Sequence, residues 1–303
     1  MKIITEIDVS VVIVNYNTKT ITENCIRSII ANTKDLRYEI ILVDNASIDN
    51  SVELFEKRKD ITFIKSPTNL GFGKANNLGV SHAIGKFVFL LNSDTVLIEN
   101  SIKNLFEFYK EKQEVLKIGV LGCLLIDVNG EINGYGENFP DVKSEIFQNL
   151  KRLPLVQKLI PNRRKSDDSK KEPFFNVDYV IGADMFLEKE IFEKYGGFDP
   201  MYFMYYEESD LQLKMARNGL KNYVVTTTKI IHLEDASNKI NDYSNRKRIV
   251  MHSSRILYLK KNWLKKYRIF LFVDKLILSL SRFNRNYAKK ENEQYISSIK
   301  KIY

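Results

Sequence analysis

A chain of 303 residues with 44% hydrophobic and 28% charged residues can bury a substantial core, in one large domain or two. Its two cysteines, Cys25 and Cys123, lie far apart and neither belongs to a Cys-x-x-Cys pair, which argues against a disulfide scaffold and against a thiolate zinc site. The net charge of +9 is unevenly placed, because residues 246–290 hold 14 Lys and Arg and one acid, Asp274, so that this segment carries +13 and the rest −4.

The first 117 residues alternate between strand-like and helix-like segments. Strands are expected at Val9–Asn15 and at residues 39–44, 61–65 and 87–92, and helices at residues 18–32, 49–59, 73–83 and 100–112, with Thr18 capping the first helix. The first strand is a near-continuous β-branched run, as expected of a strand buried on both faces. The alternation predicts a mostly parallel sheet flanked by helices, and it makes the N-terminal residues a first strand rather than a signal peptide.

The pattern changes after residue 117. Residues 118–126, the turn at 127–130 and the residues just after that turn resemble a hairpin. Residues 140–173 are polar and punctuated by proline, which predicts a long irregular excursion. Regular structure is expected again at residues 174–187, in a helix up to Tyr195, in a helix over residues 208–217 that stops at Asn218-Gly219, and in the strand-like run TTTKII.

Polar residues follow each major strand at its carboxyl end. They are Asn15, Tyr16 and Asn17, then Asp44 and Asn45, then Asn92, Ser93 and Asp94. Ligands of open α/β sheets bind beyond these ends, where a carboxylate such as that of Asp94 suits a hard divalent cation bridging phosphates. The alternative is that these residues form ordinary turns and helix caps.

Two further groups of residues suggest chemistry. Glu207, Glu208 and Asp210 begin a helix, where acids also serve as simple caps, but they follow the unusually aromatic run FDPMYFMYY. A carboxylate beside aromatic walls is suited to accept a hydroxyl proton from a sugar stacked on them. His232 follows a strand-like run, and a lone histidine there is either a ligand or a structural residue.

The segment GFGKANNLG does not fit a dinucleotide-binding motif. Its glycine spacing fails at Asn76, and it does not follow the first strand. A tight turn into a helix whose N-terminus faces an anionic donor is the better interpretation.

Seven blocks in this order resemble family 2 glycosyltransferases, particularly their rhamnosyltransferase-like branch. They are VVIVNYN, ILVDNAS, NLGFGKANNLG, LLNSDT, IGADMFL, GGFDPMYFMYYEESDL and the run from IIH to Ser237. The resemblance implies a GT-A fold over residues 1–245, with a nucleotide-sugar-binding half at about 1–117 and an acceptor-binding half at 118–245. A basic amphipathic helical tail would occupy residues 246–303.

The resemblance also implies roles for individual residues. The nucleotide-sugar site would comprise Asn15, Tyr16, Asn17, Asp44 as reader of the base, Asn69, Gly71, Asn77, Asn92 and Ser93. Asp94 and His232 would hold a divalent cation, Mg²⁺ or Mn²⁺, although Asn92 replaces the first acid of the family's Asp-x-Asp-like motif. The acceptor would meet Gly182, Ala183, Asp184, Tyr205 and Tyr206. Glu208 matches the proposed base, with glutamate in place of the commoner aspartate, and Glu207 and Asp210 stay open as alternatives.

The implied activity is a single in-line displacement that inverts the anomeric centre. Thymidine-diphosphate rhamnose is the first expected donor and uridine-diphosphate galactose or glucose the second, and the acceptor would be a saccharide or a lipid-linked saccharide in cell-surface polysaccharide synthesis. A non-catalytic nucleotide-sugar-binding protein on the same fold is the alternative of another class. A nicotinamide oxidoreductase would rest only on the α/β pattern.

The basic tail suggests a partner of its own. Its apolar window at residues 267–280 is interrupted by Arg268, Asp274 and Lys275, which makes it too charged and too short to span a bilayer. It could lie on anionic lipid or pack on the catalytic domain with its charges solvated, and no nucleic-acid-binding signature accompanies it. We therefore expect a cytoplasmic protein that is peripheral on the inner face of the bacterial cell membrane.

Overall fold

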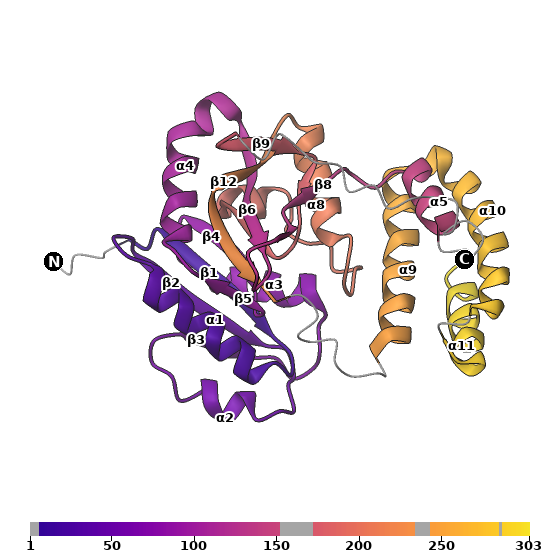
Figure 1. Ribbon diagram of the computed structural model, residues 1–303, viewed down its shortest axis with the longest axis horizontal. Helices are drawn as coiled ribbons and strands as arrows, with labels where there is room; N and C mark the ends of the chain where they lie inside the picture. The colour runs from indigo at the N-terminus through magenta and orange to yellow at the C-terminus, as the bar shows by residue number, and fades with distance from the viewer. Residues whose placement is uncertain (1–5, 152–171, 234–242, 285–286) are drawn as a thin grey trace. The chain divides into compact units, whose positions relative to one another are not determined.

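A computed structural model describes residues 6–151, 172–233, 243–284 and 287–303, which form two compact units (Figure 1). The first unit comprises Met1–Asn138, Asp168–Phe203 and Glu207–Lys239, and the second comprises Phe139–Asp167, Met204–Tyr206 and Ile240–Tyr303. The division differs from the expected boundary at residue 245, because two segments from the middle of the sequence join the C-terminal helices.

The first unit is built on one ten-stranded mixed sheet. Its strands are β1 Val9–Asn15, β2 Tyr38–Asp44, β3 Thr62–Lys65, β4 Phe87–Asn92, β5 Thr95–Leu97, β6 Ile118–Ile126, β7 Ile132–Gly134, β9 Phe174–Val177, β11 Asp184–Glu188 and β12 Lys221–His232. The main order is β3-β2-β1-β4-β11-β6-β12-β5, with β7 beside β6 and β9 beside β12. The first four strands are parallel, β11 runs antiparallel between β4 and β6, and β12 is parallel to β6. The predicted mixed, mostly parallel sheet is confirmed.

The helices of this unit are α1 Lys19–Asn32, α2 Ser51–Phe55, α3 Phe72–Ser81, α4 Ser101–Leu116, α7 Lys189–Lys194 and α8 Glu207–Arg217. Each predicted helix exists, but α2 is shorter than the expected residues 49–59. Thr18 does precede α1, yet it makes no side-chain cap, because its hydroxyl donates to Asn15 Oδ1 instead. The helix α8 ends as predicted, with Gly219 at a φ of +85°.

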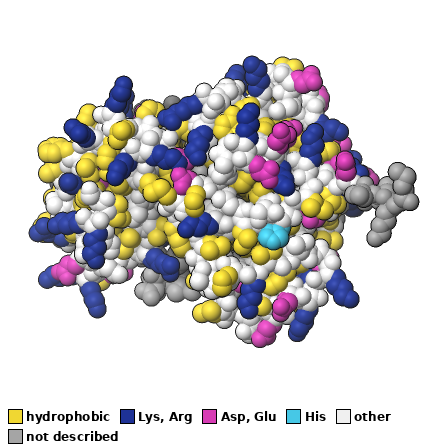
Figure 2. Space-filling view, turned by 180° about the vertical axis from the view of Figure 1, so that it is seen from behind, with side chains coloured by type: hydrophobic (Ala, Val, Ile, Leu, Met, Phe, Trp, Pro, Cys, Tyr) yellow, Lys and Arg dark blue, Asp and Glu magenta, His cyan; other side chains and the backbone are white. Residues whose placement is uncertain are grey.

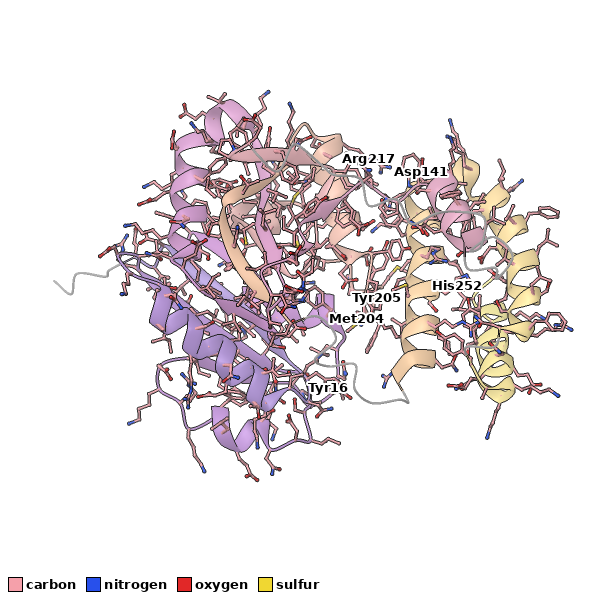
Figure 3. The ribbon with its side chains drawn as sticks, in the orientation of Figure 1. Tyr16, Asp141, Met204, Tyr205, Arg217 and His252 are labelled. Atoms are coloured by element: carbon pink, nitrogen blue, oxygen red, sulfur yellow. The ribbon has the colours of Figure 1, made fainter. Side chains whose placement is uncertain are left out.

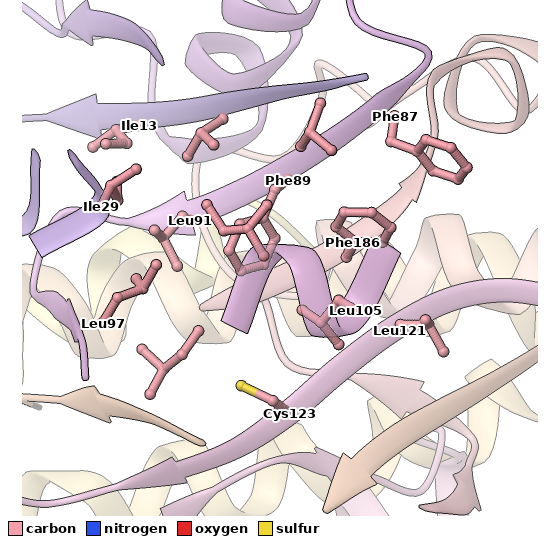
Figure 4. Packing of buried hydrophobic residues seen from close by; sticks show 14 of the residues in the cluster. Ile13, Ile29, Phe87, Phe89, Leu91, Leu97, Leu105, Leu121, Cys123 and Phe186 are labelled. Atoms are coloured by element: carbon pink, nitrogen blue, oxygen red, sulfur yellow. The ribbon is translucent and has the colours of Figure 1, made fainter. Parts of the chain in front are cut away.

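The sheet is buried on both faces, as the β-branched first strand predicted. Phe87, Phe89 and Leu91 of β4 join the core cluster on one face (Figure 4), while the intervening Val88 and Leu90 join the cluster on the other. This is the two-residue alternation of a strand covered by helices on both sides. The core therefore fixes the register of the central strands and the position of their carboxyl ends.

Two elements at the end of the sheet bear on function. The predicted hairpin after residue 117 is present as the antiparallel pair β6 and β7. The short strand β5 was not predicted, and it pairs antiparallel with β12, with Thr95 opposite His232. This pairing brings the residues after β4 next to the end of β12.

The second unit is helical within its described residues. It contains α5 Val142–Lys151, α9 Tyr243–Asn262, α10 Leu264–Leu280, the short η2 Ser281–Phe283 and α11 Lys289–Lys300. The expectation of an irregular excursion at residues 140–173 is wrong at its start, where α5 forms and packs against α10. Residues 152–171 of that excursion lie outside the described residues. Among the helices described, none combines the length and the apolarity needed to cross a bilayer.

A buried polar network holds these helices together. Arg255 Nε of α9 lies 2.8 Å from Glu145 Oε2 of α5, and Asn149 Nδ2 donates to Asp274 Oδ1 of α10 at 2.8 Å. The second Asp274 oxygen lies 2.7 Å from Nε2 of His252, a residue of α9 that is labelled in Figure 3. Burial tends to raise the pKa of Asp274, but the hydrogen bond and charge of His252 hold it below its ordinary value. His252 is thus a structural residue, and the network explains why α5 belongs to this unit.

Candidate active site

The carboxyl ends of β1 and β2 are joined by a buried hydrogen-bond network. Asn15 Nδ2 donates to Asp44 Oδ2 at 2.7 Å, and the Ser47 backbone N–H donates to Asp44 Oδ1 at 3.0 Å. Neither Asn15 nor Asp44 exposes any surface. In this conformation Asp44 therefore anchors the turn after β2, and a contact between its carboxylate and a nucleobase would require the network to open.

Tyr16 and Asn17 lie just beyond this network. Asn17 has a φ of +56°, and its Oδ1 accepts the Ile48 backbone N–H at 2.8 Å. Tyr16 is half-buried at the end of β1 (Figure 3). Of the three residues predicted at this strand end, Tyr16 and Asn17 retain exposed surface and Asn15 does not.

The glycine-rich loop before α3 is fixed by two asparagines. Asn45 Nδ2 donates to Asn69 Oδ1 at 3.1 Å, and Asn69 Oδ1 also accepts the Gly71 N–H at 2.9 Å. Gly71 adopts a φ of +82°, and a Cβ at this position would stand 2.0 Å from the Phe203 carbonyl oxygen. That same carbonyl accepts the Phe72 N–H at 2.8 Å. Only glycine permits this close approach.

Asn77 has a positioning role that differs from its predicted place beside the donor. Its Nδ2 donates to the Phe198 carbonyl at 2.7 Å, and its Oδ1 accepts the Phe198 N–H at 3.0 Å. Because both halves of the amide bind one backbone unit, Asn77 ties α3 to the aromatic segment that leads toward α8.

The end of β4 contributes backbone contacts and one side-chain contact. The Asn92 N–H donates to the Ala183 carbonyl at 2.9 Å, and the Asn92 carbonyl accepts the Thr95 hydroxyl at 2.8 Å. Ser93 Oγ lies 3.3 Å from Thr18 Oγ1. Asn92 and Ser93 therefore lie at the carboxyl end of β4, as predicted. These contacts stabilise the turn after that strand.

Asp94 and His232 come together at that edge. Asp94 Oδ1 lies 3.3 Å from His232 Nε2, and the side chains are 15% and 11% exposed. The pairing of β5 with β12 causes this approach, reinforced by a bond from the Leu233 N–H to the Asp94 carbonyl. The two residues predicted to share a cation are thus neighbours in space.

The pair fits a divalent cation that is shared with a ligand. A carboxylate oxygen and an imidazole nitrogen at this separation provide two ligands, and Mg²⁺ or Mn²⁺ commonly completes its shell with phosphate oxygens and water. Among the described residues no group of three or more His, Cys, Asp or Glu side chains is arranged to hold a metal alone. Of the described residues, these two alone would contact such a cation, and the phosphates of a donor are suited to supply further ligands.

The three acids at the start of α8 differ in their surroundings. Glu208 is partly exposed, but its Oε2 is buried and has no hydrogen-bond partner among the described residues. Burial raises the pKa of Glu208 to about 7, and the charge of Glu137 acts in the same direction. A carboxyl group with this pKa and an unused oxygen is suited to accept a proton near neutral pH.

Glu207 and Asp210 are enclosed by the protein. Glu207 is 1% exposed and its Cγ would lie 3.5 Å from a Cβ on Gly73, while Asp210 is fully buried and its Oδ2 lies 3.4 Å from Lys214 Nζ. Neither presents surface to an acceptor in this conformation. Of the three alternatives, the geometry favours Glu208.

The segment from Gly182 to Asp184 contacts residues from two parts of the predicted site. A Cβ on Gly182 would stand 3.9 Å from Glu208 Cδ and 3.4 Å from the Phe72 ring, so this partly exposed glycine lies beside the Glu208 carboxyl. The next residue, Ala183, bonds through its carbonyl to Asn92, two residues before Asp94. One short segment thus lies beside Glu208 at one residue and bonds to the end of β4 at the next.

Asp184 itself is a buried residue. It exposes no surface, its Oδ2 accepts the Cys123 N–H at 2.7 Å, and its Oδ1 has no partner among the described residues. Burial raises the pKa of Asp184 to about 7, while the Cys123 hydrogen bond and the charge of His232 oppose the rise. Ala183 is also buried, so of Gly182, Ala183 and Asp184 only Gly182 offers surface for the predicted acceptor contact.

Tyr205 and Tyr206 belong to the second unit. Both are non-glycine residues with positive φ, at +73° and +70°, which costs on the order of 1 kcal/mol or more each. The Tyr206 hydroxyl donates to Glu145 Oε1 at 3.0 Å and accepts from Arg255 Nε at 3.2 Å, so the buried network holds this conformation. Burial raises the pKa of Tyr206 to about 12, although the charge of Arg255 opposes the rise.

Sequence reasoning missed Phe72 as part of this site, and it placed Asn45 at a strand end without giving it a role. Phe72 lies against Gly182, and Asn45 organises the glycine-rich loop through Asn69 and Gly71. The position of Phe72 directly after Gly71, and that of Asn45 directly after β2, are the signals that could have identified their roles.

The proteins that this chain resembles in sequence are glycosyltransferases. The family model Glycosyl transferase family 2 matches residues 10–196. The chain is 23% identical over 218 residues to the low-salt glycan biosynthesis hexosyltransferase Agl10 of Haloferax volcanii, covering 70% of this chain and 63% of that protein. It is 24% identical over 216 residues to the rhamnosyltransferase WbbL of Escherichia coli, covering 69% of this chain and 77% of WbbL. The glycosyltransferase GlyG of Streptococcus pneumoniae is matched over 38% of its length, so the chain spans only part of some relatives.

Solved structures show the same fold. Staphylococcus aureus TarS in complex with UDP aligns with a TM-score of 0.55 at 16% identity, over 96% of this chain and 70% of TarS. The mannosyltransferase PcManGT of Pyrobaculum calidifontis, solved with GDP-Man and Mn²⁺, aligns with a TM-score of 0.55 at 16% identity, over 97% of this chain and 75% of that protein. The predicted GT-A fold is thereby confirmed.

The close approach at Gly71 gives a stability prediction. Gly71→Ala adds a Cβ that meets the Phe203 carbonyl, so we expect a loss of about 3 kcal/mol or more in the free energy of unfolding, measured by urea titration. Gly130→Ala is the matched control, because Gly130 has a similar φ of +84° with no atom within 4 Å of its added Cβ. It should lose only about 1 kcal/mol from backbone strain. Equal losses in the two variants would contradict the role of the Phe203 contact.

Proposed function

The chain belongs to glycosyl transferase family 2, and we propose that it transfers a sugar from a nucleoside-diphosphate donor to an acceptor hydroxyl with inversion of the anomeric centre. The observation that carries the proposal is the buried Oε2 of Glu208, which has no hydrogen-bond partner in the part of the chain that the structure describes. The Glu208 carboxyl lies beside Gly182, and the next residue, Ala183, bonds to the strand end before Asp94. Glu208 as a general base and Asp94 with His232 as phosphate-binding residues, connected through this segment, would suit a displacement at a carbon bound between them.

The proposed reaction is one displacement. The acceptor oxygen forms a bond to the anomeric carbon while the bond from that carbon to the diphosphate oxygen breaks, and the diphosphate leaves with the electron pair. The acceptor proton passes to Glu208, whose raised pKa matches the task. Glu208 and the neighbouring Gly182 are both partly exposed, which would give the acceptor hydroxyl access to this carboxylate.

Asp94 and His232 are proposed to hold Mg²⁺ or Mn²⁺ together with the donor diphosphate. Such a cation, when bound, neutralises negative charge that develops on a leaving diphosphate. The structure of PcManGT with GDP-Man and Mn²⁺ supports this proposal by analogy of fold.

The donor proposed first is thymidine-diphosphate rhamnose. Similarity to WbbL and to a Mycobacterium tuberculosis L-rhamnosyltransferase, 22% identical over 207 residues, supports it. A hexosyltransferase using uridine-diphosphate galactose or glucose is the second candidate, favoured by similarity to Agl10 and by the UDP complex of TarS. The acceptor is proposed to be a saccharide or lipid-linked saccharide of a surface polysaccharide, met by a cytoplasmic protein peripheral on the inner membrane face.

The direct test is transfer from a panel of nucleotide sugars, with and without Mg²⁺ or Mn²⁺. We expect a nucleoside diphosphate and a glycosylated acceptor to form only with the cation, and thermal shifts to identify which nucleotide sugar stabilises the folded chain. Donor binding without transfer to any saccharide or lipid-linked acceptor would favour the non-catalytic alternative.

Removing the proposed base should abolish transfer but spare donor binding. For Glu208→Gln we expect kcat to fall by about a hundredfold or more, because the amide cannot accept the proton. In the unaltered protein, kcat/KM should rise as the pH increases through about 7, where Glu208 loses its proton, and then level off. Glu114→Gln, an exposed substitution on α4, is the control. Normal turnover in Glu208→Gln would assign the base elsewhere.

Changing the proposed cation ligand should affect donor binding. Asp94→Asn keeps the shape of the side chain but removes its charge, so Mn²⁺-dependent donor affinity in calorimetry should fall by about tenfold or more. Asp35→Asn is the control, because Asp35 is 83% exposed and precedes β2, at the opposite end of that strand from Asp44. Unchanged affinity in Asp94→Asn, with and without EDTA, would remove Asp94 from the site.

A further inference from the structure

The outward face of α10 and η2 carries a continuous apolar stripe, here called the α10 stripe. Its members are Ile269, Phe272, Leu276, Leu280 and Phe283, each between 47% and 71% exposed. Their spacing of three, four, four and three residues keeps them on one side of a helix with 3.6 residues per turn. The stripe is therefore a single surface rather than five scattered side chains.

The opposite side of α10 already supplies its packing. Tyr267, Phe270, Asp274 and Leu278 are buried at the same kind of spacing, and they lie about half a turn away from the stripe. Exposed apolar residues in the first unit, such as Val115 and Val128, are isolated along the sequence. The α10 stripe therefore takes no part in the hydrophobic core. A contiguous exposed apolar surface of this kind marks a site that a partner covers.

The stripe is bordered by positive charge. Lys265, Arg268, Lys275 and Arg282 are exposed along α10 and η2. The one acid of α10, Asp274, is buried and bound to His252 and Asn149, so it does not offset these charges at the surface. Figure 2 shows basic and hydrophobic side chains interspersed over the second unit, with few acidic ones.

A groove adjoins the stripe near the N-terminal end of α10. Trp263 and Ile269 give it apolar surface, and Lys143, Lys266 and Asp141 give it charged edges. Because Ile269 belongs to both features, the groove and the α10 stripe form one surface. Apolar side chains next to lysines match the boundary between acyl chains and anionic headgroups.

We propose that this surface docks on a bilayer containing anionic phospholipid, with α10 lying in the plane of the interface and the α10 stripe inserted among the acyl chains. Docking through this surface would produce the peripheral membrane location that is part of the proposed function. The residues that form the surface all belong to the second unit. A second copy of this chain is the poorer occupant, because a two-fold contact would bring the same basic border against itself. Lipid phosphates complement that border.

The test uses sedimentation of the full chain with phosphatidylcholine vesicles, with or without about one third phosphatidylglycerol. Binding should be at least about tenfold tighter to the anionic vesicles. In the variant Phe272→Ser/Leu276→Ser it should weaken by at least about tenfold, because two apolar side chains no longer leave water. The control Val115→Ser/Val128→Ser changes two valines of the first unit that are even more exposed, at 82% and 72%, and it should bind normally.

Two further measurements separate charge from insertion. Arg268→Gln/Lys275→Gln should remove most of the preference for anionic vesicles and most of the salt dependence. Trp263 is the one tryptophan of the chain and lines the groove, so brominated acyl chains should quench its fluorescence. Vesicle binding without this quenching would place another surface on the bilayer and overturn the proposal.

The remaining outcomes are also decisive. Equal binding of the stripe variant and the unaltered chain would overturn the proposal, as would self-association through the stripe in the absence of vesicles. Nucleotide-sugar binding by the stripe variant should be unchanged, which shows that it is folded. Failure of sugar transfer with intact vesicle binding would count against the proposed function alone, and loss of vesicle binding with intact transfer against this inference alone.

Discussion

The backbone contact between Phe72 and Phe203 governs the geometry of the proposed active site. It joins the glycine-rich loop, which follows the parallel half of the sheet, to the aromatic segment that leads into α8. The contact requires that Gly71 have no Cβ, and Asn77 reinforces it by binding both polar groups of Phe198. Because α8 begins four residues after Phe203, the position of Glu208 is set by a loop more than a hundred residues earlier in the chain.

Sequence patterns located the polar rim of the sheet but not the role of each member. The Asn or Asp that ends each major strand predicted where a ligand would lie, and at the end of β4 the structure brings Asp94 of this rim to within 3.3 Å of His232. Asn15 and Asp44 have the same pattern, yet they bind each other below the surface. A side chain that anchors a turn and one that contacts a ligand have the same identity in the sequence, and only their partners distinguish them.

The parts of the fold that escaped prediction depend on distant contacts. Periodicity identified β1, β2 and β4 and the helices α1, α3 and α4, because each is long enough to show its own pattern. The strand β5 has three residues and exists through its pairing with β12, so no local pattern reveals it. The helix α5 is held by Glu145 and Asn149 through partners on α9 and α10, which is why its segment resembled an irregular excursion.

The same limit explains the ambiguity of the basic tail. In sequence, Arg268, Asp274 and Lys275 interrupt the apolar window and give a segment of mixed character. In the structure these three charged residues point in different directions. Asp274 is buried against His252, whereas Arg268 and Lys275 lie at the surface. Burying the one acid of α10 in a satisfied network removes negative charge from the outer face. The helix α10 therefore presents an apolar surface with positive borders, because the buried network of the second unit holds its one acid away from that surface.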